Sequence, residues 1–600
     1  MSSETKICQN CKNNFTIEPE DFKFYEKIKV PPPTWCPECR AQRRMTWRNE
    51  RALYKRKDAN GIDVISIYSE DKPVKIYERN YWWSDKWNPM DFGKDYDFSK
   101  PLFIQFRELF ESVPAASIFN SNPVNSDYCN HSGYMKNCYL TPASWECERV
   151  SYSARTINSK DSIDLMAVFK CELCYEAIDS SESYKTFFSQ NCSACFESYF
   201  LFDCKNCNNC FGCVGLRNKQ YYIFNQPYTK EGYKKRIENF DIGSYKKFND
   251  FKKTFLTHKL SFPFKFARLI NTVNVIGNNL LNAKNSKYCF DMREMEECRY
   301  LTHGFEIKDS FDGFGIGLCE LLYEGIDTGE KGASKERFSV VVYASSDTHY
   351  CFNCEGSSSL FDCIGLRNKS YCILNKQYTK EEYEKLVPKI IEHMNSMPYI
   401  DKRGRVYKYG EFFPPELSPF SYNETIAQEY FPLTKDQALD KGYSWKDPEP
   451  RNYEITLKTE DLPDHIKDVP DSILNEIIQC AHFGHAMSKC NEQCTEAYKI
   501  IPQELQFLRK MNLPLPRLCP NCRHYQRIKQ RNPLKLWHRK CQCAGATSHP
   551  STSSGYSYRN TADHIHHKKE EPCPNEFETT YAPERPEIVY CEQCYLREVV

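Results

Sequence analysis

Two stretches of this chain carry nearly the same sequence, and a tandem repeat restricts the folds that a chain can adopt. Residues 171–179 read CELCYEAID and residues 319–327 read CELLYEGID, while residues 213–219 (CVGLRNK) return as residues 363–369 (CIGLRNK). The two offsets, 148 and 150 residues, agree within a loop insertion. Each copy continues through YTKEGY or YTKEEY into a Lys/Glu-rich segment that predicts a closing helix. The chain therefore holds two related modules between residues 120 and 395.

A shorter rhythm runs through each module: a small residue or Cys, then an aromatic or aliphatic residue, then a polar or small one. Steps of nine to twelve residues between apolar positions are typical of a strand plus a turn. In the second module these positions are Phe290, Tyr300, Phe311, Tyr323, Phe352, Phe361 and Tyr371. The pattern predicts a mainly β protein built of tandem β-solenoid-like modules, flanked by small zinc-ribbon domains and a few helices. An antiparallel β meander is the alternative, because periodicity does not set strand direction.

The two ends of the chain share a second repeat. At a constant shift of 483 residues, CPECR at residues 36–40 falls on CPNCR at residues 519–523, and Phe24 falls on Phe507. Paired cysteine knuckles are typical of tetrahedral structural zinc, because all four ligands then come from the protein. The predicted ligands are Cys8, Cys11, Cys36 and Cys39 at the first end, and Cys490, Cys494, Cys519 and Cys522 at the second.

A third zinc site is predicted near the end of the sequence, with Cys541, Cys543, Cys591 and Cys594 as ligands. These cysteines bracket His564, His566 and His567, so Cys573 or a histidine could replace one thiolate. The alternative is a solvated His-rich loop beside unpaired cysteines.

A run of cysteines at every third residue, Cys204, Cys207, Cys210 and Cys213, has a spacing that departs from that of iron–sulfur proteins. We interpret these residues as small core-filling side chains.

Each ribbon is followed by a basic stretch with interleaved aromatic residues, although the whole chain is nearly neutral, with 81 basic and 80 acidic residues. Arg and aromatic side chains contact phosphates and stack on bases, so DNA or RNA is one expected partner. The alternative is a solvated helical face, or arginines that pair with acids elsewhere in the fold. The candidate contacts are Arg40, Arg43, Arg44, Arg48, Arg51, Arg523, Arg527, Lys529, Arg531 and Arg539.

The apolar pattern indicates a protein that is neither exported nor membrane-spanning. The longest apolar run, residues 340–344, is too short to cross a bilayer, and the first ten residues are polar. Many of the 32 cysteines stand in Cys-x-x-Cys pairs, which in a large chain of this kind favours metal over disulfides. We expect a cytoplasmic protein.

The patterns divide the chain into seven segments. They are a zinc ribbon with a basic tail (1–58), a cap or connector on the first module (59–119), repeat module 1 (120–248), repeat module 2 (249–398), a Pro- and aromatic-rich connector packed on the surface (399–475), a second zinc ribbon with a basic tail (476–540) and a Cys/His zinc-binding segment (541–600).

No catalytic motif stands out: the sequence has no phosphate-binding glycine loop, no His-Glu-x-x-His and no nucleophile elbow. The expected function is that of a zinc-binding scaffold that contacts nucleic acid through its basic ribbon tails. One alternative is a protein–protein scaffold that uses aromatic solenoid faces. Another is a metal-dependent nuclease or other enzyme that uses the His-rich C-terminal segment.

The GLRNK and YTKE strings of both modules, the two ribbons and the ending PEIVYCEQCY at residues 586–595 together resemble the large zinc-ribbon proteins of candidate-phyla (ultrasmall) bacteria. The resemblance covers nearly the whole chain. It implies a bacterial cytoplasmic setting and bound zinc, but no established activity and no functional residues beyond the ribbon cysteines.

Overall fold

The computed structural model describes residues 2–449, 453–483, 493–544, 556–568 and 571–599. The fold is mainly β, with 33% strand and 24% helix. The chain divides into two compact units. Unit 1 joins residues 1–118 to residues 267–447, and unit 2 joins residues 119–266 to residues 448–600. Each unit therefore combines one end of the chain with one of the two repeat modules.

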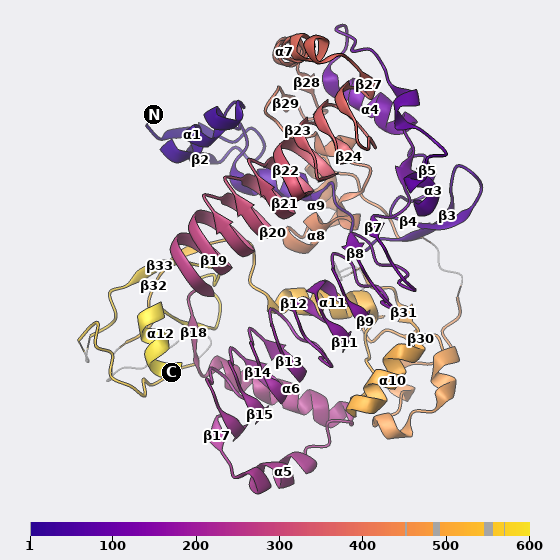
Figure 1. The fold of residues 1–600 in the computed structure, drawn as a ribbon. Helices are drawn as coiled ribbons and strands as arrows, with labels where there is room; N and C mark the ends of the chain where they lie inside the picture. The colour runs from indigo at the N-terminus through magenta and orange to yellow at the C-terminus, as the bar shows by residue number, and fades with distance from the viewer. Residues whose placement is uncertain (1, 450–452, 484–492, 545–555, 569–570, 600) are drawn as a thin grey trace. The chain divides into compact units, whose positions relative to one another are not determined.

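Both modules are parallel β-solenoids, which confirms the predicted fold class (Figure 1). In unit 2, Lys160 pairs with Glu148 and Thr186 pairs with Ser198, each in a parallel register of twelve residues. In unit 1, Arg299 pairs in the same way with Phe311. Within the repeats the pairing is parallel, and an antiparallel pair appears only where each solenoid ends, at β16–β17 and at β26–β27. The meander alternative is therefore excluded for the described modules.

A left-handed backbone conformation at every third residue shapes each coil. In unit 2, for example, φ is positive at Asn137, Leu140, Ala143, Glu146 and Arg149. A coil of twelve residues thus has four short sides that meet at left-handed corners. Asn, Asp and Gly are frequent at these corners because they adopt this conformation at the lowest cost. The residue after each corner is the one that points into the coil, as the complete burial of Cys207, Cys210 and Cys213 shows.

Small inward side chains satisfy the backbone as well as filling the interior. The backbone N–H groups of Cys174 and Cys210 donate to the hydroxyl groups of Ser162 and Ser198 one coil earlier, both at 3.0 Å. The thiol of Cys213 donates to the carbonyl of Phe211 at 3.4 Å. Buried polar groups need such partners. Cysteine and serine therefore suit the same inward positions. The run of cysteines at every third residue, Cys204 to Cys213, lines the inside of a coil, as the sequence interpretation expected.

In unit 2 the solenoid is followed by helices and then, after a gap in sequence, by the second ribbon. Its elements are β7 (Asn120–Ser121), β8 (Ser132–Gly133), β9 (Glu148–Ser151), β10 (Ala154–Ile157), β11 (Lys160–Ile163), β12 (Met166–Phe169), β13 (Tyr184–Gln190), β14 (Phe196–Phe202), β15 (Asn208–Phe211), β16 (Gln220–Ile223), β17 (Gln226–Pro227), α5 (Lys230–Glu238), α6 (Tyr245–Leu260), β18 (Pro263–Lys265), β30 (Ile478–Gln479), β31 (Ala497–Tyr498), α10 (Pro502–Met511), α11 (Pro520–Gln530), β32 (Trp537–Lys540), β33 (Glu576–Thr579), β34 (Ile588–Tyr590) and α12 (Glu592–Val599).

In unit 1 the first ribbon precedes its solenoid in sequence by more than 200 residues. The elements are β1 (Glu4–Ile7), β2 (Asn14–Ile17), α1 (Pro19–Ile28), α2 (Pro37–Met45), β3 (Tyr54–Lys57), β4 (Asp63–Ser66), β5 (Ile76–Tyr77), α3 (Arg79–Trp83), α4 (Leu102–Ser112), β6 (Ala115–Ala116), β19 (Leu269–Glu296), β20 (Arg299–Lys308), β21 (Phe311–Glu320), β22 (Tyr323–Tyr343), β23 (Ser346–His349), β24 (Phe352–Glu355), β25 (Ser358–Phe361), β26 (Ser370–Ile373), β27 (Lys376–Gln377), α7 (Lys380–Ser396), β28 (Tyr399–Ile400), β29 (Val406–Tyr407), α8 (Ile426–Tyr430) and α9 (Lys435–Asp440).

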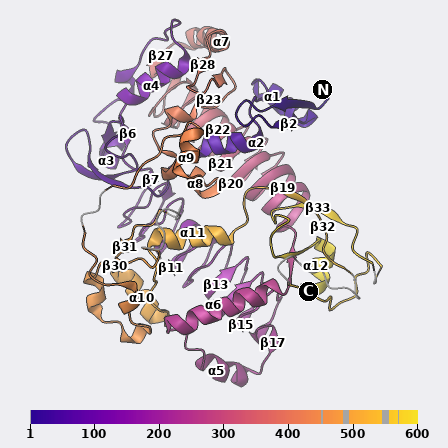
Figure 2. The same cartoon turned by 180° about the vertical axis from the view of Figure 1, so that it is seen from behind.

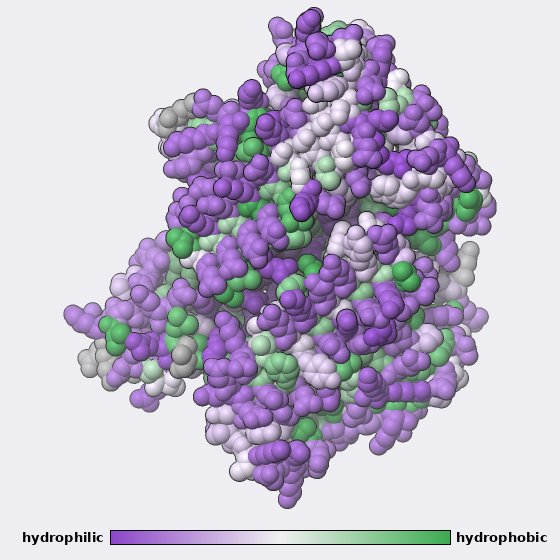
Figure 3. Space-filling model, viewed as in Figure 1, coloured by the Kyte–Doolittle hydropathy of each residue, from purple (hydrophilic) through white to green (hydrophobic). Residues whose placement is uncertain are grey.

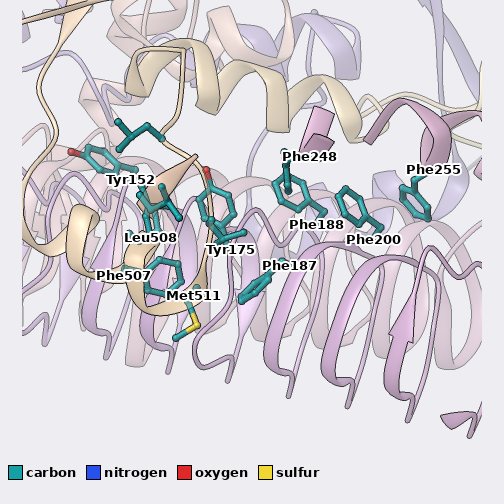
Figure 4. Close-up of a cluster of buried hydrophobic side chains, with 14 of the residues drawn as sticks. Tyr152, Tyr175, Phe187, Phe188, Phe200, Phe248, Phe255, Phe507, Leu508 and Met511 are labelled. Atoms are coloured by element: carbon teal, nitrogen blue, oxygen red, sulfur yellow. The ribbon is translucent and has the colours of Figure 1, made fainter. Parts of the chain in front are cut away.

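Helices bury the outward aromatic residues of one solenoid face. In unit 2, Phe188 and Phe200 of neighbouring coils stack at 5.1 Å between ring centroids, and Phe248 of α6 lies 4.4 Å from Phe188 (Figure 4). Phe507 of α10 reaches the next part of the same face, beside Tyr175. The high aromatic content of the sequence is thus used largely where helices meet coils.

The segment expected to cap or connect to the first module, residues 59–119, contains α4, which covers the second module instead. Its residues Phe103 and Phe110 meet Tyr350 and Phe352 at centroid distances of 5.4 and 5.0 Å. The expectation of a cap on the first module was therefore wrong. The closing helices α5 and α7 were predicted correctly, and both begin after an N-capping threonine.

The segment expected as a surface connector contributes to the core of unit 1. Phe412 and Phe413 are completely buried, and Trp47 packs against both rings. Aromatic pairs at this spacing add to the stability gained by burial alone.

Among the described residues, no helix is long and apolar enough to cross a membrane. In the space-filling view, hydrophilic residues dominate the visible face and hydrophobic ones are scattered among them (Figure 3).

Candidate metal centres

The first cysteine group lies at the junction of a hairpin and a helix. Cys8 and Cys11 occupy the turn between β1 and β2, and Cys36 and Cys39 stand at the start of α2. The four sulfur atoms lie within 4.8 Å of one another. The Cys11 and Cys36 sulfur atoms are 3.8 Å apart. That is the spacing of about 3.8 Å that a tetrahedral zinc ion with zinc–sulfur bonds of about 2.3 Å requires.

The second group consists of Cys480, Cys494, Cys519 and Cys522, which include three of the four predicted ligands. Its sulfur atoms are 3.9 Å apart between Cys480 and Cys522 and 4.0 Å apart between Cys519 and Cys494. The fourth predicted ligand, Cys490, lies outside the described residues. The sequence spacing did not indicate Cys480 as a ligand, because the first knuckle of this ribbon carries an insertion. In the structure Cys480 directly follows β30, just as Cys8 directly follows β1.

The third group differs from the predicted one by a single member. Cys541, Cys573, Cys591 and Cys594 lie together, and all four are buried. The Cys573 and Cys591 sulfur atoms are 3.9 Å apart. Cys543 lies instead in a separate group with His564, His567 and Cys594.

All three groups follow one template. A Cys-x-x-Cys pair opens a helix, and the backbone N–H of its first cysteine donates to the sulfur of the group's first ligand. The three bonds are Cys36 to Cys8 at 3.2 Å, Cys519 to Cys480 at 3.2 Å and Cys591 to Cys541 at 3.1 Å. Hydrogen bonds of this kind stabilise thiolates. Hydrogen bonds from the other three thiols likewise hold the pKa of Cys519 well below its ordinary value. The C-terminal segment is thus a third ribbon-like site.

In unit 1 the helix that starts at the first metal group carries arginines into the solenoid. Arg40 donates to both carboxylate oxygens of Asp312 at 3.0 and 2.8 Å, and Arg44 reaches Asp312 at 3.1 Å and Glu324 at 2.8 Å. Arg43 bridges Glu324 and Glu411 at 2.8 and 2.7 Å. All these side chains are at most 4% exposed. Buried charges are tolerated only when they are paired in this way.

In unit 2 the helix α11 repeats the arrangement on the first module (Figure 2). Arg523 and Arg527 each donate to Asp164 at 2.6 Å, and Arg523 also donates to Glu504 at 2.9 Å. Arg531 pairs with Asp179 at 2.8 Å. The third helix, α12, places Tyr595 on Asp203 of the same solenoid.

The residue numbers show that the ribbon repeat and the module repeat belong to a single duplication. Arg40, Arg44 and Arg48 fall on Arg523, Arg527 and Arg531 at the ribbon shift of 483 residues. Their partners Asp312 and Asp327 fall on Asp164 and Asp179 at the module offset of 148 residues. The repeated entity is therefore a ribbon together with the solenoid that it clamps. In chain order, the first ribbon clamps the second module and the second ribbon clamps the first.

We call the buried ion pairs between each ribbon helix, α2 or α11, and its solenoid a clamp. Electrostatic attraction strengthens both clamps. Burial acts to lower the pKa of Arg40, but the Asp312 carboxylate is the main group that outweighs it, so the pKa lies well above its ordinary value. The same balance, with Asp164 and Glu504 as the anions, raises the pKa of Arg523. Burial raises the pKa of Glu504, against the opposing charge of Arg523. Arg40 and Arg523 therefore stay charged throughout the accessible pH range.

Gly315 shows how closely the ribbon approaches the coil. It has φ +65°, and a Cβ atom there would lie 2.6 Å from the guanidinium of Arg48. Arg48 pairs with Asp327 at 2.9 Å and with Glu50 at 2.8 Å. A side chain at position 315 would therefore displace the arginine from its partners.

The basic residues predicted to contact nucleic acid are thus placed mainly inside the fold. Arg40, Arg43, Arg44, Arg48, Arg523 and Arg527 are buried and paired with acids. Of the rest, Arg51, Arg531 and Arg539 are half-buried and Lys529 is exposed. A buried guanidinium that is already paired with a carboxylate cannot reach a phosphate. These positions favour the alternative prediction, ion pairing within the fold.

Comparison with known proteins adds no assignment. No protein-family model matches the chain, and no curated protein matches its sequence.

Proposed function

We propose that this chain is a zinc-stabilised scaffold whose solenoid faces bind a protein partner. The observation that carries the proposal is the burial of the arginines in the first two ribbons, which makes the four-cysteine group of each part of a clamp on a solenoid. Four sulfur ligands favour zinc among the common divalent ions, and a closed set of four thiolates leaves no position for substrate. The metal then acts by fixing the start of α2, α11 or α12 against the coils.

Equivalent positions of successive coils form columns of side chains along each solenoid. The exposed columns suit a protein partner better than a polyanion. In unit 2, Lys136 and Glu148 pair at 3.2 Å along one column. In unit 1, Lys284 and Glu296 pair at the same distance along the matching column. Alternating charges of this kind cancel and provide no positive field for a phosphate backbone.

The same unit 2 column continues into apolar side chains. Tyr184 and Phe196 occupy equivalent positions on neighbouring coils, and they are 39% and 40% exposed. Exposed aromatic neighbours with charged flanks are typical of interaction surfaces. We assign the partner-binding surface to this column.

The test is quantitative affinity purification of the full chain from a lysate of its source cells, with and without nuclease. Proteins enriched with the wild type should be lost with the double variant Tyr184→Ser/Phe196→Ser. They should be retained with the control variant Lys160→Ser/Glu172→Ser, which alters polar residues of the same column. Enrichment that survives the aromatic change would contradict the assignment, and enrichment abolished by nuclease would point to nucleic acid instead.

A further inference from the structure

A second set of metal-binding side chains lies directly beside the third four-cysteine group. The nearest ring nitrogen atoms of His564 and His567 lie 3.2 and 3.5 Å from the Cys543 sulfur. The His567 nitrogen is also 3.7 Å from the Cys594 sulfur. These four donor atoms lie within 4.8 Å of one another. Two sulfur and two nitrogen donors at this spacing match a tetrahedral zinc site with two cysteine and two histidine ligands.

The hydrogen bonds on the far side of each ring orient both histidines. His564 uses its Nε2 for the carboxylate of Glu598 at 2.7 Å, which leaves Nδ1 facing Cys543. His567 uses its Nδ1 for the backbone carbonyl of Lys568 at 2.9 Å, which leaves Nε2 facing the sulfur atoms. Metal-binding histidines characteristically donate their other ring N–H to a carboxylate or a backbone carbonyl. His564 and Glu598 are both at most 2% exposed as side chains, so this orientation is built into the core.

Cys594 belongs to both sets. Its sulfur lies within 4.8 Å of the sulfur atoms of Cys541, Cys573 and Cys591, and equally within that distance of the donors of Cys543, His564 and His567. We propose that the C-terminal segment holds two zinc ions bridged by the Cys594 thiolate, one in the four-cysteine set and one in the Cys543–His564–His567–Cys594 set. The proposal concerns metal content and does not depend on a partner for the solenoids.

Charge balance supports the pair of ions. Five thiolates, two neutral imidazoles and two zinc ions carry a net charge of about −1, whereas one zinc ion with the same five thiolates would leave about −3 in a buried cluster. Two amides stabilise the remaining negative charge: Asn560 donates to Cys543 at 3.2 Å and Asn575 donates to Cys591 at 3.3 Å.

His566 is the competing ligand and provides a matched control. Its Nε2 lies 3.2 Å from the Cys594 sulfur and 3.6 Å from the Cys573 sulfur. Among the described residues, however, no hydrogen bond holds its other ring nitrogen in the way that Glu598 holds His564. The structure therefore assigns the ligand roles to His564 and His567.

The experiment is to measure zinc per chain by mass spectrometry of the purified full-length protein, for the wild type and two single variants. The wild type should carry four zinc ions, His564→Ala three, and His566→Ala four. A wild-type content of three zinc ions would show that the C-terminal segment does not hold a second ion and would overturn the proposal. Loss of zinc in His566→Ala but not in His564→Ala would overturn the assignment of His564 as a ligand.

Cadmium-113 NMR of the cadmium-substituted wild type needs no variant and covers the case in which His564→Ala fails to fold. It should show four resonances, one of them at a shift typical of mixed sulfur and nitrogen ligands and coupled to an all-sulfur resonance through Cys594. Three resonances, all typical of sulfur ligands, would contradict the bridged pair.

Discussion

The clamp between ribbon and solenoid should fail when a single solenoid carboxylate is removed. Asp312 accepts three hydrogen bonds from Arg40 and Arg44, and its side chain is completely buried. The change Asp312→Asn keeps the shape but turns an amide N–H toward the guanidinium groups. Loss of one partner from a buried ion pair costs about 3 to 5 kcal/mol. Because Glu324 still reaches Arg44 at 2.8 Å, the cost here should lie toward the lower end.

Urea unfolding, followed by tryptophan fluorescence, measures this change. Trp35 and Trp47 are buried around α2 and report on unit 1. The control is Asp63→Asn, the same chemical change in an ion pair of unit 1 whose acidic side chain is 86% exposed. Exposed pairs contribute little to stability, so this variant should unfold like the wild type. If Asp312→Asn were no more destabilising than Asp63→Asn, the arginines would not clamp the ribbon to the coil.

Three further predictions address the metal, the coil interior and pH. Cys36→Ser/Cys39→Ser should lose one zinc ion per chain and unfold the first ribbon, since structural zinc contributes about 10 kcal/mol or more to such folds; unchanged zinc content would refute the site. Cys207→Ser/Cys210→Ser should leave the zinc and iron content unchanged, because these sulfur atoms line a coil; loss of metal would contradict the core-filling role. Burial and the charge of Arg337 hold the pKa of His349 well below its ordinary value. Below about pH 6.5 the unfolded chain therefore takes up a proton that the folded chain does not. In that pH range the free energy of unfolding of unit 1 should fall by up to about 1.4 kcal/mol per pH unit. As the pH is lowered from about 7.5 to about 5.5, across the ordinary pKa of histidine, urea midpoints should fall less steeply for His349→Gln than for the wild type, and equal slopes would show that His349 does not carry the effect.

The sequence predicted the solenoid because its inward positions tolerate few residue types. Cys, Ser and Ala recur there because the interior of a twelve-residue coil is narrow and its backbone N–H groups need nearby acceptors. The three-residue side was harder to recognise, because the left-handed corners accept Leu140 and Ala143 as well as Asn and Asp. A search for Asn, Asp and Gly at every third position would have revealed it.

The metal ligands were predictable where the knuckle spacing was short. Cys480 is separated from Cys494 by an insertion, and Cys573 stands alone in the sequence, so spacing alone could not assign them. The roles of the arginines depend on acids more than 100 residues away, such as Asp312 and Asp164. Only the comparison of both repeats at once, at shifts of 483 and 148 residues, could have linked Arg40 to Asp312.

Hydrogen–deuterium exchange of the full-length chain, before and after zinc removal by a chelator, tests most directly whether the ribbons are metal-dependent clamps. Removal should release protection together in α2 and in the coil around Asp312, and likewise in α11 and in the coil around Asp164. The interior of the coils around Cys204 and Cys213 should remain protected. If α2 and α11 kept their protection without zinc, or if the whole solenoid lost it, the metal would not act as the clamp inferred from these contacts.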